Sequence, residues 1–186
     1  MSDVELKNFR VHFDYNFFSD LIINSYKDDT SAVELVRALP EIHVFFDIQT
    51  LFELVNETFQ IYAKTTEPGF RNKAMKSIAY ICPNLPEANV LRVMSRMKEL
   101  VYTTWEYTET AALVEAFTYI VSHVKLDSLE VYKILICVKH FLVHPNNLIL
   151  QKTKALIKYV YETAPREDIV QIVSPILLGF TNVPFI

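Results

Sequence analysis

The chain has 186 residues, of which 51% are hydrophobic and 22% are charged, so it can bury a core and is not intrinsically disordered. Its formal net charge of −4 argues against a nucleic-acid module, because such modules usually carry a basic balance. Its only two glycines, Gly69 and Gly179, argue against turn-rich β folds and against loops that cradle phosphates or dinucleotides.

The number and setting of the cysteines and the hydropathy of the chain indicate the cellular compartment. Cys82 and Cys137 lie far apart among apolar residues, so we expect buried, reduced thiols, as in a cytosolic or nuclear protein. The longest apolar stretches, such as 134–138 and 172–180, are short against the ~20 residues of a membrane helix. The acidic start of the chain does not resemble a signal peptide. We expect an intracellular protein, nuclear or cytoplasmic, with no membrane partner.

In the first part of the chain, apolar periodicity and capping residues predict two helices. The first runs from about 14 or 15 to 26. The second begins at Ser31, which forms a capping-box pattern with Glu34. It ends before Pro40, because a residue that precedes proline disfavours the helical region.

Seven more helices are predicted in the rest of the chain. Their expected ranges are about 41 or 47 to 63, 70–81, 86–102, 108 or 109 to 124, 128–143, 146–162 and 166–179. Pro86 suits the first position of its helix, where the missing N–H is not needed. Asp127 with Glu130 repeats the capping-box spacing, and Asn146 is a capping residue. Pro175 predicts a kink or a break in the last helix.

These helices repeat at a regular interval. Acidic residues that favour a helix start lie 40 residues apart, at Asp47, Glu87, Asp127 and Glu167. Each intervening helix carries an alanine, Ala74, Ala116 or Ala155, which we expect to let neighbouring helices approach closely. A period near 40 with two helices per unit predicts an α-solenoid.

The segment from Glu67 to Ile78 gives the repeat a family resemblance. Its turn, Glu67-Pro68-Gly69, is followed by Phe70, Arg71 and then Ala74, and resembles the start of the second helix of a HEAT repeat. Residues 144–155 are similar, with Lys152 in the place of the arginine, whereas the unit around Ala116 has Leu113 there and no proline in its turn.

This resemblance to ARM/HEAT-type repeats covers about 47–180 and implies an all-α chain, a short superhelix of antiparallel helix pairs. We expect residues 1–46 to be an atypical helical cap and 47–186 to be HEAT-like repeats in one continuous domain. The apolar C-terminal end, with Phe185 and Ile186, leaves two alternatives. Either the chain is a fragment or a partner covers this end, or these residues pack back onto the last helix.

No catalytic or metal-binding pattern stands out. His140 and His144 have the helical spacing of two metal ligands, but no glutamate follows the first, and Lys139 would repel a cation. The 22 acidic residues show no pair in an apolar setting, and no nucleophile motif or phosphate loop occurs. We therefore expect no enzyme activity, no cofactor, no metal and no small-molecule substrate.

Aromatic residues supply the first candidates for partner binding. Trp105, flanked by Tyr102 and Tyr107, lies in a loop between two predicted helices. It either contacts a partner or fills the gap between two helix pairs. Phe9 and Phe13 belong to an aromatic cluster near the N-terminus, which is either a partner-binding patch or a cover for the apolar end of the stack.

Basic residues supply the second candidates. Arg71, Lys73 and Lys154 lie near the starts of equivalent helices, so a solenoid would place them on one surface as a basic ridge for an acidic peptide or a phosphate backbone. The alternative is an ordinary mixed, solvated face.

Together these features predict a non-catalytic scaffold or adaptor that binds other protein subunits inside a larger complex. The alternatives are a nucleic-acid-associated helical repeat, which would use the basic ridge, and a segment similar to a nuclear transport receptor. Nuclear transport receptors are acidic stacks of HEAT repeats, and this chain is acidic too.

Overall fold

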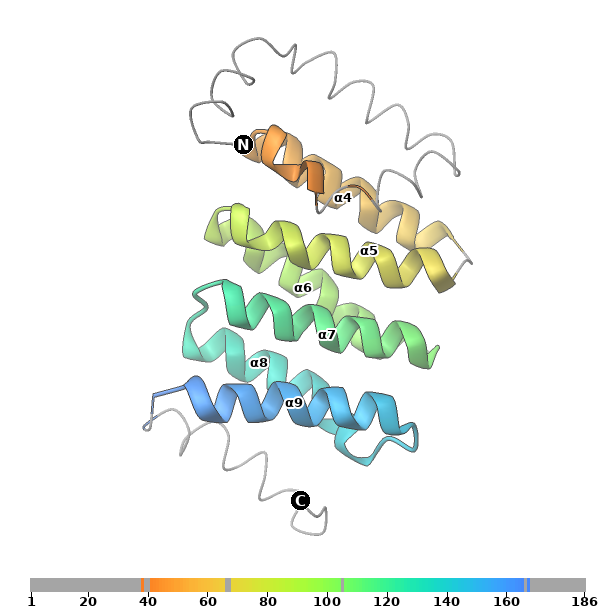
Figure 1. The fold of residues 1–186 in the computed structure, drawn as a ribbon, viewed down its shortest axis with the longest axis vertical. Helices are drawn as coiled ribbons and strands as arrows, with labels where there is room; N and C mark the ends of the chain where they lie inside the picture. Colours follow the sequence, from red (N-terminus) through yellow and green to blue (C-terminus); the bar gives the residue numbers. More distant parts are fainter. Residues whose placement is uncertain (1–37, 39–40, 66–67, 105, 166, 168–186) are drawn as a thin grey trace. The chain divides into compact units, whose positions relative to one another are not determined.

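The computed structural model describes residues 38, 41–65, 68–104, 106–165 and 167, and all the regular secondary structure in this part of the chain is helical (Figure 1). No strand occurs in these ranges, which confirms the all-α prediction. The chain divides into two compact units, 1–89 and 90–186. The helices predicted at about 14–26, 31–39 and 166–179 fall outside the described residues.

The first unit contains an antiparallel helix pair, α4 (Ile48–Lys64) and α5 (Pro68–Ile81), flanked by the 3-10 turns η1 (His43–Phe45) and η2 (Cys82–Asn84). Asp47 begins α4, because its carboxylate accepts the N–H of Thr50 at 2.8 Å. Pro68 is the first residue of α5, where a proline costs no hydrogen bond. Buried apolar side chains on both helices pack in this unit, among them Leu54, Val55, Phe59, Phe70, Met75 and Ile78.

The second unit holds four helices in two layers. They are α6 (Glu87–Thr103), whose first turn crosses the unit boundary, α7 (Tyr107–His123), α8 (Ser128–Val138) and α9 (Asn147–Thr163). α7 and α9 lie side by side in one layer, with α6 and α8 behind them (Figure 1). The core between the layers is fully buried and apolar, with Met94, Leu113, Phe117, Ile120, Ile134 and Leu156.

Two predicted helix caps of this unit are confirmed and one start is shifted. Asp127 accepts the N–H of Glu130 at 2.7 Å, and Asn146 accepts the N–H of Leu148 at 2.9 Å. α7 begins earlier than expected, because Glu106 and not Thr108 is its cap. The Glu106 carboxylate accepts the N–H groups of both Thr108 and Glu109, at 2.8 and 3.0 Å.

The predicted continuous helix over 128–143 is wrong. α8 ends at Val138, and the chain tightens into the 3-10 helix η3 (Lys139–Val143). The cause is Pro145, which disfavours the helical region for His144; that residue is extended, with φ −70° and ψ 133°. The N–H of His144 then closes the turn on the Phe141 carbonyl at 3.1 Å.

The repeat prediction has a mixed outcome. Asp47, Glu87 and Asp127 do stand at the starts of α4, α6 and α8, whereas the helix expected around Glu167 lies outside the described residues. Ala74 and Ala116 are buried, but Ala155 is exposed. It lines an open groove of about 310 Å³ with Glu115, Thr118 and Tyr119, so the described helices do not cover its side chain.

None of the described helices combines the length and the apolar character that crossing a membrane requires.

Candidate partner-binding surface

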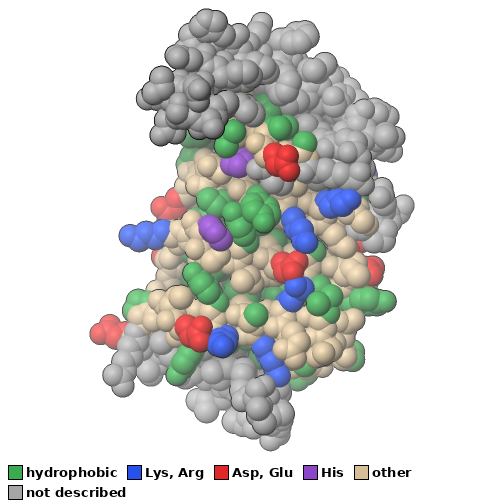
Figure 2. Space-filling view, in the orientation of Figure 1, with side chains coloured by type: hydrophobic (Ala, Val, Ile, Leu, Met, Phe, Trp, Pro, Cys, Tyr) green, Lys and Arg blue, Asp and Glu red, His purple; other side chains and the backbone are tan. Residues whose placement is uncertain are grey.

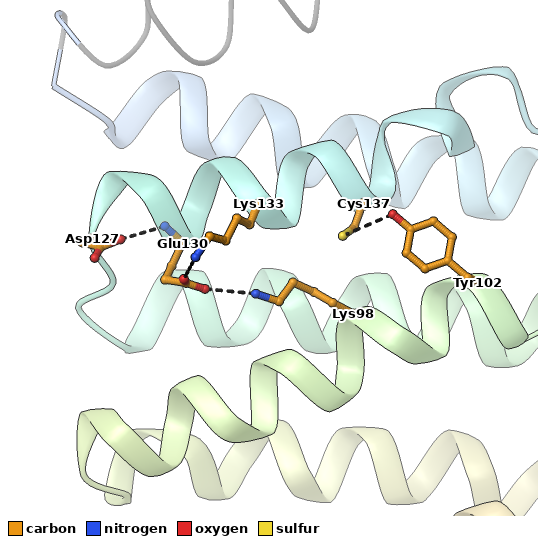
Figure 3. Close-up of polar contacts among 6 residues, drawn as sticks. All are labelled: Lys98, Tyr102, Asp127, Glu130, Lys133 and Cys137. Carbon is orange, nitrogen blue, oxygen red and sulfur yellow. Dashed lines mark hydrogen bonds and ion pairs between the residues drawn. The ribbon is translucent and has the colours of Figure 1, made fainter.

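The seam between α6 and α8 is held by a shared carboxylate (Figure 3). Glu130, in the first turn of α8, accepts a hydrogen bond from the Lys98 ammonium of α6 at 3.0 Å and another from Lys133 on its own helix. These two lysines hold the pKa of Glu130 below its ordinary value, Lys133 contributing the larger effect, although partial burial opposes them. Glu130 therefore completes no capping box with Asp127, because its carboxylate is taken by the lysines.

Tyr102 lies at the other end of the same seam. Its hydroxyl donates a hydrogen bond of 3.6 Å to the Cys137 thiol, as drawn in Figure 3, and this contact, together with partial burial, raises the pKa of Tyr102. The ring stacks on His140, with centroids 6.2 Å apart and planes 17° apart. Even so, Tyr102 is 64% exposed. An exposed aromatic ring thus has two contacts with residues of α8 and η3.

His140 is part of the same arrangement as Tyr102. Burial lowers the pKa of His140, an effect that the carbonyl of Cys137 opposes and His144 reinforces. His144 has a different task, since its Nδ1 accepts the N–H of Asn146 at 3.0 Å. In the described part of the chain, no group of three or more His, Cys, Asp or Glu could hold a metal ion.

Further apolar side chains are exposed at this end of the second unit. Here α6 and η3 finish and α7 and α9 begin, at the right of Figure 1. Tyr107 is 54% exposed, Val143 64% and Leu148 48%. We call Tyr102, Tyr107, His140, Val143 and Leu148 the aromatic end. It is the largest concentration of exposed apolar side chains in the described part of this unit.

The sequence found part of this surface. Tyr102 and Tyr107 are exposed there, while Trp105, between them, lies outside the described residues, as do Phe9 and Phe13. Sequence reasoning missed Cys137, Val143 and Leu148 as members or supports of the surface. A signal did exist for the last two, because they flank the turn at Pro145 and have no apolar partner one helical turn away.

The predicted basic ridge is not assembled within either unit. Arg71 and Lys73 belong to the first unit, where the Arg71 guanidinium lies over the Tyr62 ring, 5.3 Å from its centroid. Lys154 belongs to the second unit and is half-buried on α9. Next to it, Lys152 forms an ion pair with Glu115 of α7. Figure 2 shows acidic and basic side chains interspersed on this α7–α9 face.

Comparisons with family models, with curated proteins and with solved structures gave no match.

Proposed function

We propose that this chain is a non-catalytic interaction module, a scaffold or adaptor subunit of a larger intracellular complex, and that it binds a partner protein through the aromatic end. The observation that carries the proposal is the state of Tyr102, which is largely exposed and yet fixed by the Cys137 thiol and the His140 ring.

A fixed aromatic side chain suits binding for an energetic reason. Association costs free energy for each side chain that must be ordered, about 0.5–1.5 kcal/mol for a rotamer-rich one. The hydrogen bond to Cys137 and the contact with His140 restrict the ring of Tyr102 before a partner binds, so its apolar area can contribute to affinity with less of that loss. The lowered pKa of His140 keeps its imidazole neutral at physiological pH, so no charge has to be desolvated beside the ring.

We also propose that the helix pairs are stacked as a short HEAT-like solenoid. The support comes from the second unit, where helices that are one repeat apart contact each other: α6 meets α8 through Lys98 and Glu130, and α7 meets α9. In a solenoid each repeat contacts the next one in this way. Such a stack would give the aromatic end a rigid support.

The two alternatives have less support. A nucleic-acid-associated repeat would need the cations of the predicted ridge free to meet phosphates, whereas Arg71 lies over the Tyr62 ring and Lys152, close to the ridge residue Lys154, is paired with Glu115. A role similar to that of a nuclear transport receptor rests only on the acidic composition and the helix-pair size.

Affinity capture with the full-length chain tests the proposal when three versions are compared. The original chain should retain a stoichiometric partner from extract, and Tyr102→Ala should retain at least fivefold less, as for a residue at the centre of an interface. Tyr161→Ala is the matched control, because Tyr161 is similarly exposed, at 52%, but lies near the opposite end of α9. Equal retention by all three versions would refute the role of the aromatic end.

A further inference from the structure

A side chain closes the turn between η3 and α9. The Nδ1 atom of His144 accepts a hydrogen bond of 3.0 Å from the backbone N–H of Asn146, two residues further on. This is the pattern of an Asx-turn, in which the side-chain oxygen of an asparagine or aspartate accepts the same N–H. Here an imidazole nitrogen takes the place of that oxygen. We call residues 144–146 the histidine turn.

The histidine turn is bonded to regular structure on both sides. The N–H of His144 itself donates to the carbonyl of Phe141 in η3 at 3.1 Å. On the other side, Asn146 is the N-cap of α9, and its side chain accepts the N–H of Leu148 at 2.9 Å. Val143 and Leu148, which flank the turn, are both exposed members of the aromatic end. The bond at His144 therefore helps to hold these two apolar side chains at a fixed spacing.

The bond depends on the protonation state of His144. Its Nδ1 atom can accept only while it carries no proton, so the imidazole must be neutral with its proton on Nε2. An imidazolium ion has a proton on both nitrogens and accepts no hydrogen bond. Histidine is the side chain that ordinarily changes charge between about pH 5 and pH 8. Mild acid can therefore remove this bond, whereas an asparagine in the same place would keep its acceptor.

α8 and α9 pack on η3 and bring no acid to the histidine turn. Their acidic residues, Glu130 and Glu162, lie at the ends of the two helices that are remote from the turn. Their lysines nearest to it, Lys133 and Lys152, are in ion pairs. Next to η3, α8 contributes the thiol of Cys137.

η3 itself disfavours a positive charge at His144. Lys139 is an exposed cation on this helix. Burial lowers the pKa of His140, and the charge of His144 lowers it further, so the two histidines repel each other when both are protonated. From α6, the ring of Tyr102 stacks on His140. Among these described groups, none offers the negative charge that would compensate an imidazolium for the lost hydrogen bond.

We propose that the histidine turn is a pH-sensitive support of the aromatic end, closed while His144 is neutral and opened when it is protonated. In the open turn, Val143 and Leu148 are held less firmly. A partner then has to order them on binding, which lowers the affinity. The opening of the turn is a property of the free chain, whereas its effect on a partner rests on the function proposed above.

Hydrogen exchange at the Asn146 amide of the full-length chain tests the turn without any partner. Its protection, corrected for intrinsic exchange, should fall about threefold to tenfold between about pH 8 and pH 5, as for the loss of one hydrogen bond. The amide of Val124, bonded to the carbonyl of Ile120 at the opposite end of α7, should keep its protection and so controls for a general effect of acid.

Two variants of His144 separate its titration from its role as an acceptor. His144→Asn retains an acceptor that does not titrate, so the protection of Asn146 should no longer depend on pH. His144→Ala has no acceptor and should show the low protection at both pH values. Equal protection at both pH values in the original chain, or the same fall in His144→Asn, would overturn the proposal.

Affinity capture at the same two pH values then links the turn to the aromatic end. Retention of a partner by the original chain should fall together with the protection of Asn146, and retention by His144→Asn should depend less on pH. If no version retains a partner at either pH, the proposed function fails, while the exchange data still decide whether the turn opens. If protection falls but retention does not, the histidine turn does not support the aromatic end, and the proposal is overturned.

Discussion

Lys98 donates a hydrogen bond of 3.0 Å to the carboxylate of Glu130 and so connects α6 to α8 across 32 residues of sequence. The side chains of these two residues are only 17% and 12% exposed. Water and salt therefore screen this ion pair less than a typical surface pair. Lys133, the second partner of Glu130, is 47% exposed and lies on the same helix.

The difference in exposure predicts unequal effects of two substitutions. Glu130→Gln should lower the free energy of unfolding by about 1–2 kcal/mol, because it leaves the half-buried Lys98 without its carboxylate. Lys133→Met should lower it by no more than about 0.5 kcal/mol, as for an exposed pair within one helix. Urea denaturation measures both. Equal effects of the two would contradict the cross-helix role of Glu130.

Low pH should remove the contribution of Glu130 to the free energy of unfolding. The pKa of Glu130 is lower in the folded chain than its ordinary value, so the folded state holds this proton less tightly than the unfolded state does. Its contribution to stability is therefore complete at neutral pH and is lost as the pH falls through the lowered pKa. Glu130→Gln should flatten this acid dependence in thermal melts.

Glu106 caps the start of α7 and should stabilise it. Glu106→Ala removes the acceptor for the N–H groups of Thr108 and Glu109 and should cost about 1 kcal/mol of stability. Glu106→Asp should retain part of this effect, because a shorter carboxylate is still a cap. Hydrogen exchange at these two amides provides a local readout, and unchanged protection in Glu106→Ala would show that the cap is dispensable.

The two cysteines should differ in reactivity. Burial raises the pKa of the Cys82 thiol to about 12, so at pH 8 only about one thiol in ten thousand is ionised. Cys82 should therefore resist an aromatic disulfide reagent until the chain unfolds. Cys137, at the edge of the surface beneath Tyr102, should react first, and faster still in Tyr102→Ala. Simultaneous reaction of both thiols in the native chain would contradict this order.

The two alanines of the second unit provide a test of packing. Ala116→Leu should lower stability by about 1–3 kcal/mol, because Ala116 is 2% exposed and a larger side chain overpacks its site. Ala155→Leu should change stability by no more than about 0.5 kcal/mol, since Ala155 is exposed. A comparable loss in both variants would mean that Ala155 is covered in solution.

Local chemistry explains where sequence-based prediction succeeded. The caps at Asp127 and Asn146 and the start of α4 at Asp47 involve groups within three residues, so their outcome depends on the nearby sequence alone. The same reasoning failed at Glu130, whose spacing promised a capping box. Two lysines bind that carboxylate: Lys133 is three residues away on the same helix, whereas Lys98 is brought within reach only by the packing of α6 on α8.

The sequence by itself determined that this chain is helical and where most of its described helices begin and end, because periodicity, proline and caps act over a single turn. Tertiary structure alone decided which faces are covered. In the folded chain Ala155 is exposed and Ala116 is buried, and the Tyr102 hydroxyl donates a hydrogen bond to the thiol of Cys137, 35 residues away. The physical reason is that burial and long-range contacts depend on how helices pack against one another, which no local pattern encodes.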